Sequence, residues 1–280
     1  MAIALAINLS LLVAEAVGGI LTGSLALLAD AGHVLSDVGA IALGMVAVRV
    51  AARGGGPRRT FGFQRAEVVA GLANGVALAV IAVLIGIEAV GRLSDPAELD
   101  AAPVLVLGAV GLAGNVAATW VLARGERGDV NLEGVLRHSA ADALGSVGVI
   151  VSAILILAAG LDAADPVASL LISALVLASS WRLISEPLDV LMEAAPHRLD
   201  VERLGREICA VDEVRGVHDL HVWTVTAGFE TLAAHVVVDR GADRDLVRAR
   251  VEMLLRDRFG IDHTTRQVEE EADEGLIQLD

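Results

Sequence analysis

The 280-residue sequence contains one cysteine, no tyrosine and no lysine, and aromatic residues make up only 2% of it. Because Cys209 is the sole thiol, an intramolecular disulfide framework and a metal site built from several cysteines are both excluded. All 21 basic residues are arginines, and 36 acidic residues outnumber them, so the formal net charge is −15. A chain with this charge is not expected to bind nucleic acid, whose phosphates attract basic surfaces.

What the sequence does contain is apolar mass: 55% of its residues are hydrophobic, and the mean hydropathy is +0.66. Ala and Gly contribute much of it, and such small residues let helices pack closely within lipid. A hydrocarbon core of about 30 Å requires roughly 20 residues of helix, and six stretches are long enough. These predicted membrane spans are residues 2–21, 25–48, 68–90, 103–123, 136–159 and 167–184.

The charges between the predicted spans indicate their orientation. Arginines cluster between the second and third spans and again between the fourth and fifth, whereas the loops after the third and fifth spans are acidic. Because arginine-rich loops remain in the cytoplasm, these loops and both chain termini are expected on the cytoplasmic side of a cell membrane. We therefore expect a multi-pass protein in contact with membrane lipid, with a six-helix transmembrane domain over residues 1–190.

Residues 191–280 have the composition of a soluble module that ends in an acidic tail. Apolar periodicity predicts two helices and three strands within this C-terminal module. The helices are expected at residues 200–211 and 244–259, and the strands at 217–226, 231–239 and 264–268. The expected fold class is therefore an α-helical membrane protein with a small C-terminal α+β domain, whose helices cover one face of a sheet.

Two of the predicted spans carry a histidine and an aspartate four residues apart. The pairs are His33 with Asp37 in the second span and His138 with Asp142 in the fifth. An aspartate inside a bilayer costs roughly 2.5–3.5 kcal/mol on insertion scales, so such residues indicate a functional site. Residues four apart share one helix face, and two imidazoles with two carboxylates match the ligands of one tetrahedral zinc ion. Hydrogen bonding between helices is the alternative role, and Asp30, one turn before His33, is either an outer partner or a proton acceptor.

A second candidate metal site lies in the C-terminal module. His218 and His235 fall on strands that are expected to be neighbours, and His263 or Glu269 can join them from the third strand. His221 is three residues from His218 and points to the opposite face of a regular strand, so one metal ion is not expected to use both. The alternative is that these histidines are core or surface residues that hold no metal.

Several motifs along the chain resemble one known family. They are ADAGHVLSD in the second span, FGFQRAE after it, HSAADALGSVGVI in the fifth span, and GVHDLHVW, AAHVVV and TTRQVE in the module. In this order, and over nearly the whole chain, they resemble the cation diffusion facilitator family of metal–proton antiporters. The resemblance implies a homodimer with ferredoxin-like, metallochaperone-like cytoplasmic domains. It also implies a transport site that prefers zinc over cadmium, formed by a membrane quartet of His33, Asp37, His138 and Asp142.

The sequence departs from this family pattern in two loops and leaves one ligand open. The loop between the second and third spans has arginine and phenylalanine in place of metal ligands, and the loop between the fourth and fifth spans is short and has no histidine. In the module, His218, His235 and Glu269 match ligand positions. Both His263 and Gln267 are candidates for the fourth ligand.

Together these features predict a transporter that exports Zn²⁺ from the cytoplasm in exchange for protons, with Zn²⁺ as its substrate and as a regulatory ligand of the module. One alternative is the same antiporter with broader specificity for Cd, Co, Mn or Fe, because imidazole and carboxylate accept those metals too. Another is a membrane metal sensor that transports nothing. An enzyme is not expected, since the sequence has no HExxH motif and four protein ligands leave no coordination position for a reactive water. Near the membrane, Arg65 is expected to pair with Glu193.

Overall fold

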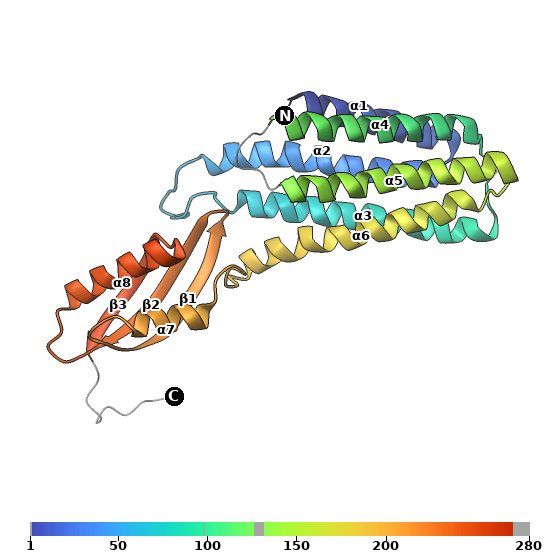
Figure 1. Ribbon diagram of the computed structural model, residues 1–280. Coiled ribbons are helices and arrows are strands. Elements are labelled where there is room, and N and C mark those ends of the chain that lie inside the picture. Colours follow the sequence, from blue (N-terminus) through green and yellow to red (C-terminus); the bar gives the residue numbers. More distant parts are fainter. Residues whose placement is uncertain (1, 98, 126–131, 271–280) are drawn as a thin grey trace. The chain divides into compact units, whose positions relative to one another are not determined.

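The computed structural model describes the chain in three stretches, residues 2–97, 99–125 and 132–270 (Figure 1). Side chains are described for residues 5–97, 99–120 and 142–270. The chain forms two compact units. The first unit consists of Met1–Arg49 with Val69–Ser185, and the second consists of Val50–Val68 with Glu186–Asp280.

Six long helices make up most of the first unit. They are α1 (Ala2–Thr22), α2 (Leu25–Ala51), α3 (Ala66–Ser94), α4 (Ala101–Gly125), α5 (Leu132–Ala159) and α6 (Ala164–Leu191). Within the described stretches, each of the six is long and apolar enough to cross a membrane. They confirm the six predicted spans. Most extend a few residues beyond the predicted limits, because polar residues at the ends of an apolar stretch also keep the helical conformation.

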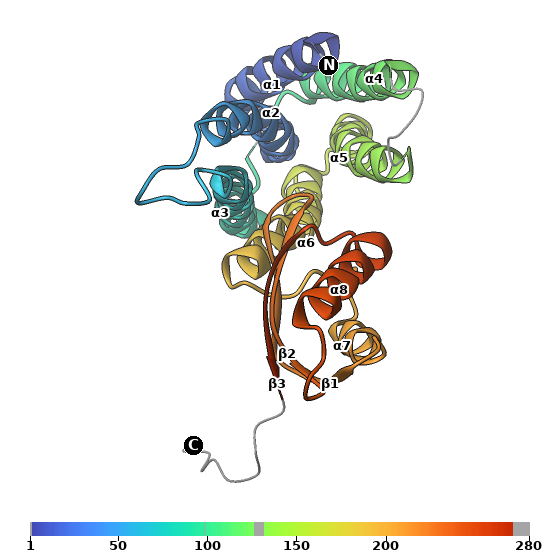
Figure 2. The ribbon, with the colours of Figure 1, turned by 90° about the vertical axis from the view of Figure 1, so that its left-hand side faces the viewer.

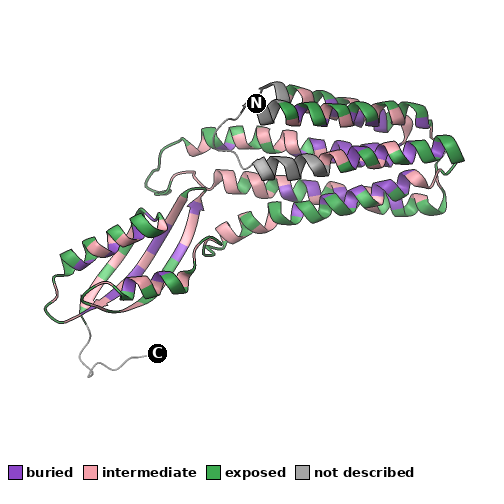
Figure 3. Cartoon of the chain, in the orientation of Figure 1, coloured by how far each residue is buried: buried purple, intermediate pink, exposed green. Residues whose placement is uncertain are grey.

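Close contact between two of these helices depends on glycine. A Cβ atom added to Gly75 of α3 would lie 2.9 Å from the backbone carbonyl carbon of Leu183 in α6, closer than carbon atoms pack. Small residues have this role in membrane helices, where they let backbones approach each other. The helices carry exposed apolar side chains, among them Leu84, Ile87 and Leu171, as expected where helices face lipid. Figure 3 shows that exposed residues occur along the long helices.

The C-terminal module is a three-stranded sheet with two helices on one face, within the part of it that the structure describes (Figure 2). Its elements are α7 (Val201–Cys209), β1 (Val214–Thr226), β2 (Phe229–Val238), α8 (Arg244–Phe259) and β3 (His263–Glu270). β1 pairs with β2 in antiparallel fashion and β2 pairs with β3 in parallel, so α8 forms the crossover between them. The two helices bury Leu204, Ile208, Val251 and Leu255 in the core beside the sheet. This confirms the predicted α+β domain.

Aspartates begin both helices of the module. The Asp200 side chain accepts a hydrogen bond from the backbone nitrogen of Arg203 at 2.9 Å and so caps α7, as its position before the apolar stripe predicts. Asp243 caps α8 in the same way, and α8 ends at Gly260, whose φ of 68° suits a residue without a side chain. The helix limits in the module therefore follow from local sequence.

The loop between α2 and α3 belongs to the same compact unit as the module. The Phe61 ring lies edge-on to the rings of Phe229 and His263, at centroid distances of 6.2 and 5.9 Å. Arg65 forms the expected ion pair with Glu193, with 3.0 Å between Nη2 and Oε1. The sequence alone groups this loop with the membrane helices, whereas its contacts group it with the module.

Candidate metal centres

Helices α2 and α5 carry the first candidate site. Nε2 of His33 lies 2.7 Å from Oδ1 of Asp142, although 109 positions separate the two residues in the sequence. With Asp37 they form a group in which each residue offers one ligand atom, and these atoms all lie within 4.8 Å of one another. The His33 and Asp142 side chains are only 13% and 15% exposed. The structure therefore brings together three of the four residues that the sequence predicts.

His138, the fourth predicted ligand, belongs to α5, but its side chain lies outside the described residues. It precedes Asp142 by four positions, or about one helical turn, which is the relationship of His33 to Asp37 on α2. Helices rather than loops hold all four positions. Imidazole nitrogens together with carboxylate oxygens form a donor set that suits Zn²⁺ and other divalent transition metals.

Asp30 lies one turn before His33, but the group of ligand atoms does not include it. It is 1% exposed, and its Oδ2 accepts a hydrogen bond from Oγ of Ser146 on α5 at 2.9 Å. Asn115 on α4 in turn donates to the Ser146 hydroxyl at 3.3 Å. The spacing along α2 identifies Asp30 from the sequence alone, whereas Ser146 and Asn115 were not predicted, although polar residues within apolar helices are the signal that marks them.

Asp165, at the start of α6, holds the beginning of α2. Its carboxylate accepts hydrogen bonds from Oγ of Ser24 at 2.6 Å and from the backbone nitrogen of Leu25 at 2.7 Å. These bonds satisfy donors at the N-terminus of α2 and place a negative charge at the positive end of the helix dipole. Asp165 was not predicted from the sequence. It helps to fix the helix that carries His33 and Asp37.

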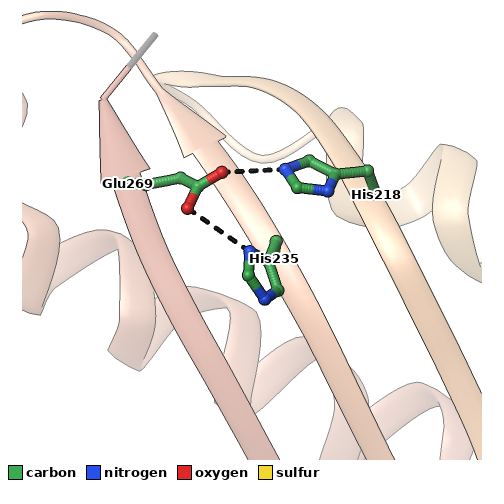
Figure 4. Close-up of side chains that lie close together, drawn as sticks. All are labelled: His218, His235 and Glu269. Atoms are coloured by element: carbon green, nitrogen blue, oxygen red, sulfur yellow. Dashed lines mark hydrogen bonds and ion pairs between the residues drawn. The ribbon is translucent and has the colours of Figure 1, made fainter. Parts of the chain in front are cut away.

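The second candidate site lies on the sheet of the module (Figure 4). Nε2 of His218 is 2.8 Å from Oε1 of Glu269, and Nδ1 of His235 is 3.3 Å from Oε2 of the same carboxylate. The strand register places His218 on β1 opposite His235 on β2, with 4.9 Å between the ring centroids. Each of the three residues offers a ligand atom within 4.8 Å of the others. We call this group the sheet cluster.

The Glu269 carboxylate affects the protonation of the sheet cluster. The hydrogen bond between Glu269 and His218 raises the pKa of His218 and lowers the pKa of Glu269. Asp219, which sequence analysis missed, places Oδ2 3.3 Å from Nδ1 of His218. Its φ of 47° belongs to an irregular part of β1, where the register shifts between His218 and His221. The signal in the sequence was an aspartate between two histidines, but in a regular strand the Asp219 side chain would point to the face opposite His218.

His263 does not join the sheet cluster. It begins β3 opposite Thr231, whereas Glu269 comes six residues later in the same strand. At about 3.3 Å per residue, this separation is roughly 20 Å. His263 packs against Phe229 instead, with 5.2 Å between ring centroids. Of the two candidates for a fourth ligand, Gln267 is the one near the cluster, since its Nε2 donates to Oε2 of Glu269 at 2.9 Å.

Comparisons with known proteins cover both units of the chain. Residues 1–192 match the cation efflux transmembrane domain, and residues 196–271 match the cation efflux protein cytoplasmic domain. The zinc transporter ZitB of Yersinia pestis is 39% identical over 95% of this chain and 86% of its own length. The cadmium, cobalt and zinc/H(+)-K(+) antiporter of Bacillus subtilis is 36% identical over 93% of this chain and 85% of its own. The metal-bound C-terminal domain of the CzcD transporter from Cupriavidus metallidurans is 35% identical, with a TM-score of 0.25, over 25% of this chain and 99% of that one.

The match to the transmembrane domain spans more than half of the chain, and the two relatives align over nearly all of it. Both findings agree with the resemblance that the motifs indicate, and with six membrane helices followed by a small α+β domain. The chain is a multi-pass membrane protein and belongs to the cation efflux family.

Proposed function

We propose that this protein is a secondary transporter that exports Zn²⁺ from the cytoplasm in exchange for protons. The observation that carries the proposal is the convergence of His33, Asp37 and Asp142 from two membrane helices, with ligand atoms within 4.8 Å of one another. With His138 from the preceding turn of α5, these residues supply two nitrogens and two oxygens, a set that fits tetrahedral Zn²⁺. Relatives named as zinc transporters support this choice of metal.

The contact between His33 and Asp142 gives a physical basis for exchange with protons. At 2.7 Å, the imidazole nitrogen and the carboxylate oxygen share one hydrogen. Zn²⁺ requires lone pairs on both atoms, so the metal ion and this proton compete for the same place. Metal that arrives from the cytoplasm displaces the proton, and protonation from the other side releases the metal.

The arginine-rich loops support an orientation with both termini and the C-terminal module in the cytoplasm, in the cytoplasmic membrane of a bacterial-type cell. The sheet cluster then binds Zn²⁺ as a regulatory ligand, because it belongs to the module, whereas the quartet belongs to the membrane helices. The family resemblance supports a homodimer as the working form.

Broader divalent specificity is the second candidate function. The name of the Bacillus relative includes cadmium and cobalt beside zinc. Imidazole and carboxylate donors bind those metals as well, so the quartet alone does not restrict transport to zinc.

Metal flux in sealed vesicles tests the proposal. The purified chain is placed in vesicles with its cytoplasmic side outward, a zinc-sensitive dye is enclosed, and an acidic lumen is imposed. We expect Zn²⁺ to enter faster with the pH gradient than without it, and the acceleration to vanish when an ionophore collapses the gradient. The same assay with Cd²⁺, Co²⁺ and Mn²⁺ measures specificity. Zinc binding without any flux would identify a sensor and contradict the proposal.

A further inference from the structure

A second group of buried acids lies close to the quartet. Glu15 on α1 and Asp30 on α2 are each 1% exposed, so both carboxylates are buried within the membrane domain. Burying two carboxylates inside a membrane domain costs free energy unless a positively charged species accompanies them. The two acids have very different surroundings.

The two carboxylates differ in their hydrogen bonds. Ser146 donates to Asp30, and Asn115 supports Ser146. Neither carboxylate oxygen of Glu15 accepts a hydrogen bond from any residue in the described stretches. Buried polar atoms almost always have a partner, and an ionised carboxylate needs one most. The orphaned oxygens of Glu15 therefore point to a positively charged species that binds there.

Glycines provide the space in which these carboxylates lie. A Cβ atom on Gly111 of α4 would lie 2.5 Å from Oε1 of Glu15 and 3.4 Å from Oγ of Ser146. A Cβ atom on Gly145 of α5 would lie 2.5 Å from Oδ1 of Asp30. Glu15 is thus directed toward the hydroxyl that also binds Asp30, in a site built by four neighbouring helices, α1, α2, α4 and α5 (Figure 2).

This site forms a second layer next to the quartet. Asp30 precedes His33 by three positions on α2, and Ser146 follows Asp142 by four on α5, so each is about one turn away from a metal ligand. In the metal layer, His33 of α2 contacts Asp142 of α5 at 2.7 Å, and in the second layer Asp30 of α2 contacts Ser146 of α5 at 2.9 Å. The two layers therefore lie one helical turn apart along the same pair of helices and consist of different residues.

We propose that Glu15, with Asp30 beside it, holds the monovalent counter-cation of the exchange, a proton or an alkali cation, one turn from the metal. The donors here are carboxylate, hydroxyl and amide oxygens with no imidazole, which suits a proton or a hard cation better than zinc. The titratable groups one helical turn away are His33 on α2 and Asp142 on α5, which belong to the metal layer. Metal in one layer therefore repels the cation in the other, and the effect is reciprocal. The role of this cation in transport rests on the proposed exchange function, whereas its binding to Glu15 does not.

The Glu15→Gln variant of the full chain in proteoliposomes tests the role. Zinc-for-zinc exchange across the membrane needs no counter-cation and should remain at the parental rate. Net zinc flux driven by a proton gradient, or in a second arm by a potassium or sodium gradient, should fall by about tenfold or more. The arm in which the loss occurs identifies the cation. Glu88→Gln, which changes an exposed acid on α3, is the matched control and should match the parent in both assays.

Infrared difference spectroscopy on the purified full chain tests binding independently of flux. The band of a buried carboxyl that responds to pH, or of a buried carboxylate that responds to potassium or sodium, should be present in the parent and in Glu88→Gln and should be lost or weakened in Glu15→Gln. If the parent shows this band but no net zinc flux, the site stands and the transport proposal fails. If Glu15→Gln keeps the parental bands, or keeps full gradient-driven flux, Glu15 does not hold the counter-cation.

Discussion

His33 and Asp142 face each other from α2 and α5 with 2.7 Å between Nε2 and Oδ1. The atoms that would hold the metal therefore also join the two helices. Removing either residue removes a proposed ligand and a helix–helix contact together. A test of the site must therefore measure transport and folding separately.

Alanine at any position of the membrane quartet should reduce zinc transport by at least about 100-fold, since losing even an outer partner of a metal site costs about 10–100-fold. The four variants are H33A, D37A, H138A and D142A. Asp37→Asn should be nearly as damaging as D37A, because the neutral amide keeps the shape but is a poor metal ligand. Vesicle flux measures transport, and the yield of monodisperse protein reports insertion and folding. Full transport by two of the alanine variants would show that the quartet is not the transport site.

The His33→Asp variant should gain cadmium transport relative to zinc. It replaces a nitrogen donor with a third carboxylate, and larger cations accept longer and more numerous oxygen contacts than compact tetrahedral Zn²⁺ does. The added negative charge also makes the empty site hold protons more tightly, so zinc activity should shift to higher pH. The measurement is the cadmium-to-zinc flux ratio across about pH 6 to 8, around the histidine reference pKa of about 6.5. A ratio equal to that of the parent at every pH would contradict this prediction.

His218→Ala and His235→Ala should remove zinc from the sheet cluster and weaken transport only in part. These residues lie in the module, so their loss leaves the membrane quartet intact. Competition between the full chain and a chelating dye gives the number and affinity of bound zinc ions. His263→Ala is the matched control, because His263 packs with Phe229 away from the cluster. If H218A and H235A bind as much zinc as H263A does, the cluster is not a metal site.

The metal-free module should lose pH-dependent stability when Glu269 is replaced by Gln. Folding raises the pKa of His218 from 6.5, so its contribution is fully present below pH 6.5 and is lost as the pH rises through the folded value. Folding lowers the pKa of Glu269 from 4.5, so its contribution is present above pH 4.5 and is lost at lower pH. The Tm difference between E269Q and the parent, measured with a chelator, should therefore be largest between pH 4.5 and 6.5. An equal difference at alkaline pH would contradict the ion pair.

Asp165→Ala should destabilise the membrane domain by about 1.5–3 kcal/mol, the range for hydrogen bonds to a charged group. The variant leaves the Ser24 hydroxyl and the backbone nitrogen of Leu25 without their acceptor. Asp165→Asn keeps one oxygen and should recover part of the loss. Thermal unfolding of the purified protein measures the effect, with Asp162→Asn as a nearby control. A Tm equal to that of the control would show that the cap does not hold α2.

The positions of the membrane helices, and the common helix face of His33 and Asp37, could be predicted because they depend on local spacing. A long apolar stretch makes a spanning helix, and a separation of four residues places His33 and Asp37 on one face. The contacts of Asp165 with Ser24 and of Ser146 with Asp30 could not be predicted in this way. They join segments more than 100 residues apart, so they depend on how the helices pack and not on either segment alone.

The sheet cluster, too, could be predicted only in part from local sequence. Alternation along the strands identified His218 and His235, but the register of β3 decides which of its residues reaches them. That register places Glu269 at the cluster and His263 at the far end of the strand. Asp219 was missed because an irregularity in β1, which no alternating pattern indicates, turns it toward His218.

Glu269 belongs to β3, the last strand of the described chain, and follows His218 by 51 residues and His235 by 34. Because synthesis runs from the N-terminus, both histidines and every membrane ligand leave the ribosome before the carboxylate that joins the sheet cluster. A chain that stops short of residue 269 has both histidines of the sheet cluster but lacks the carboxylate that joins them. The assembled cluster therefore shows that synthesis has passed residue 269.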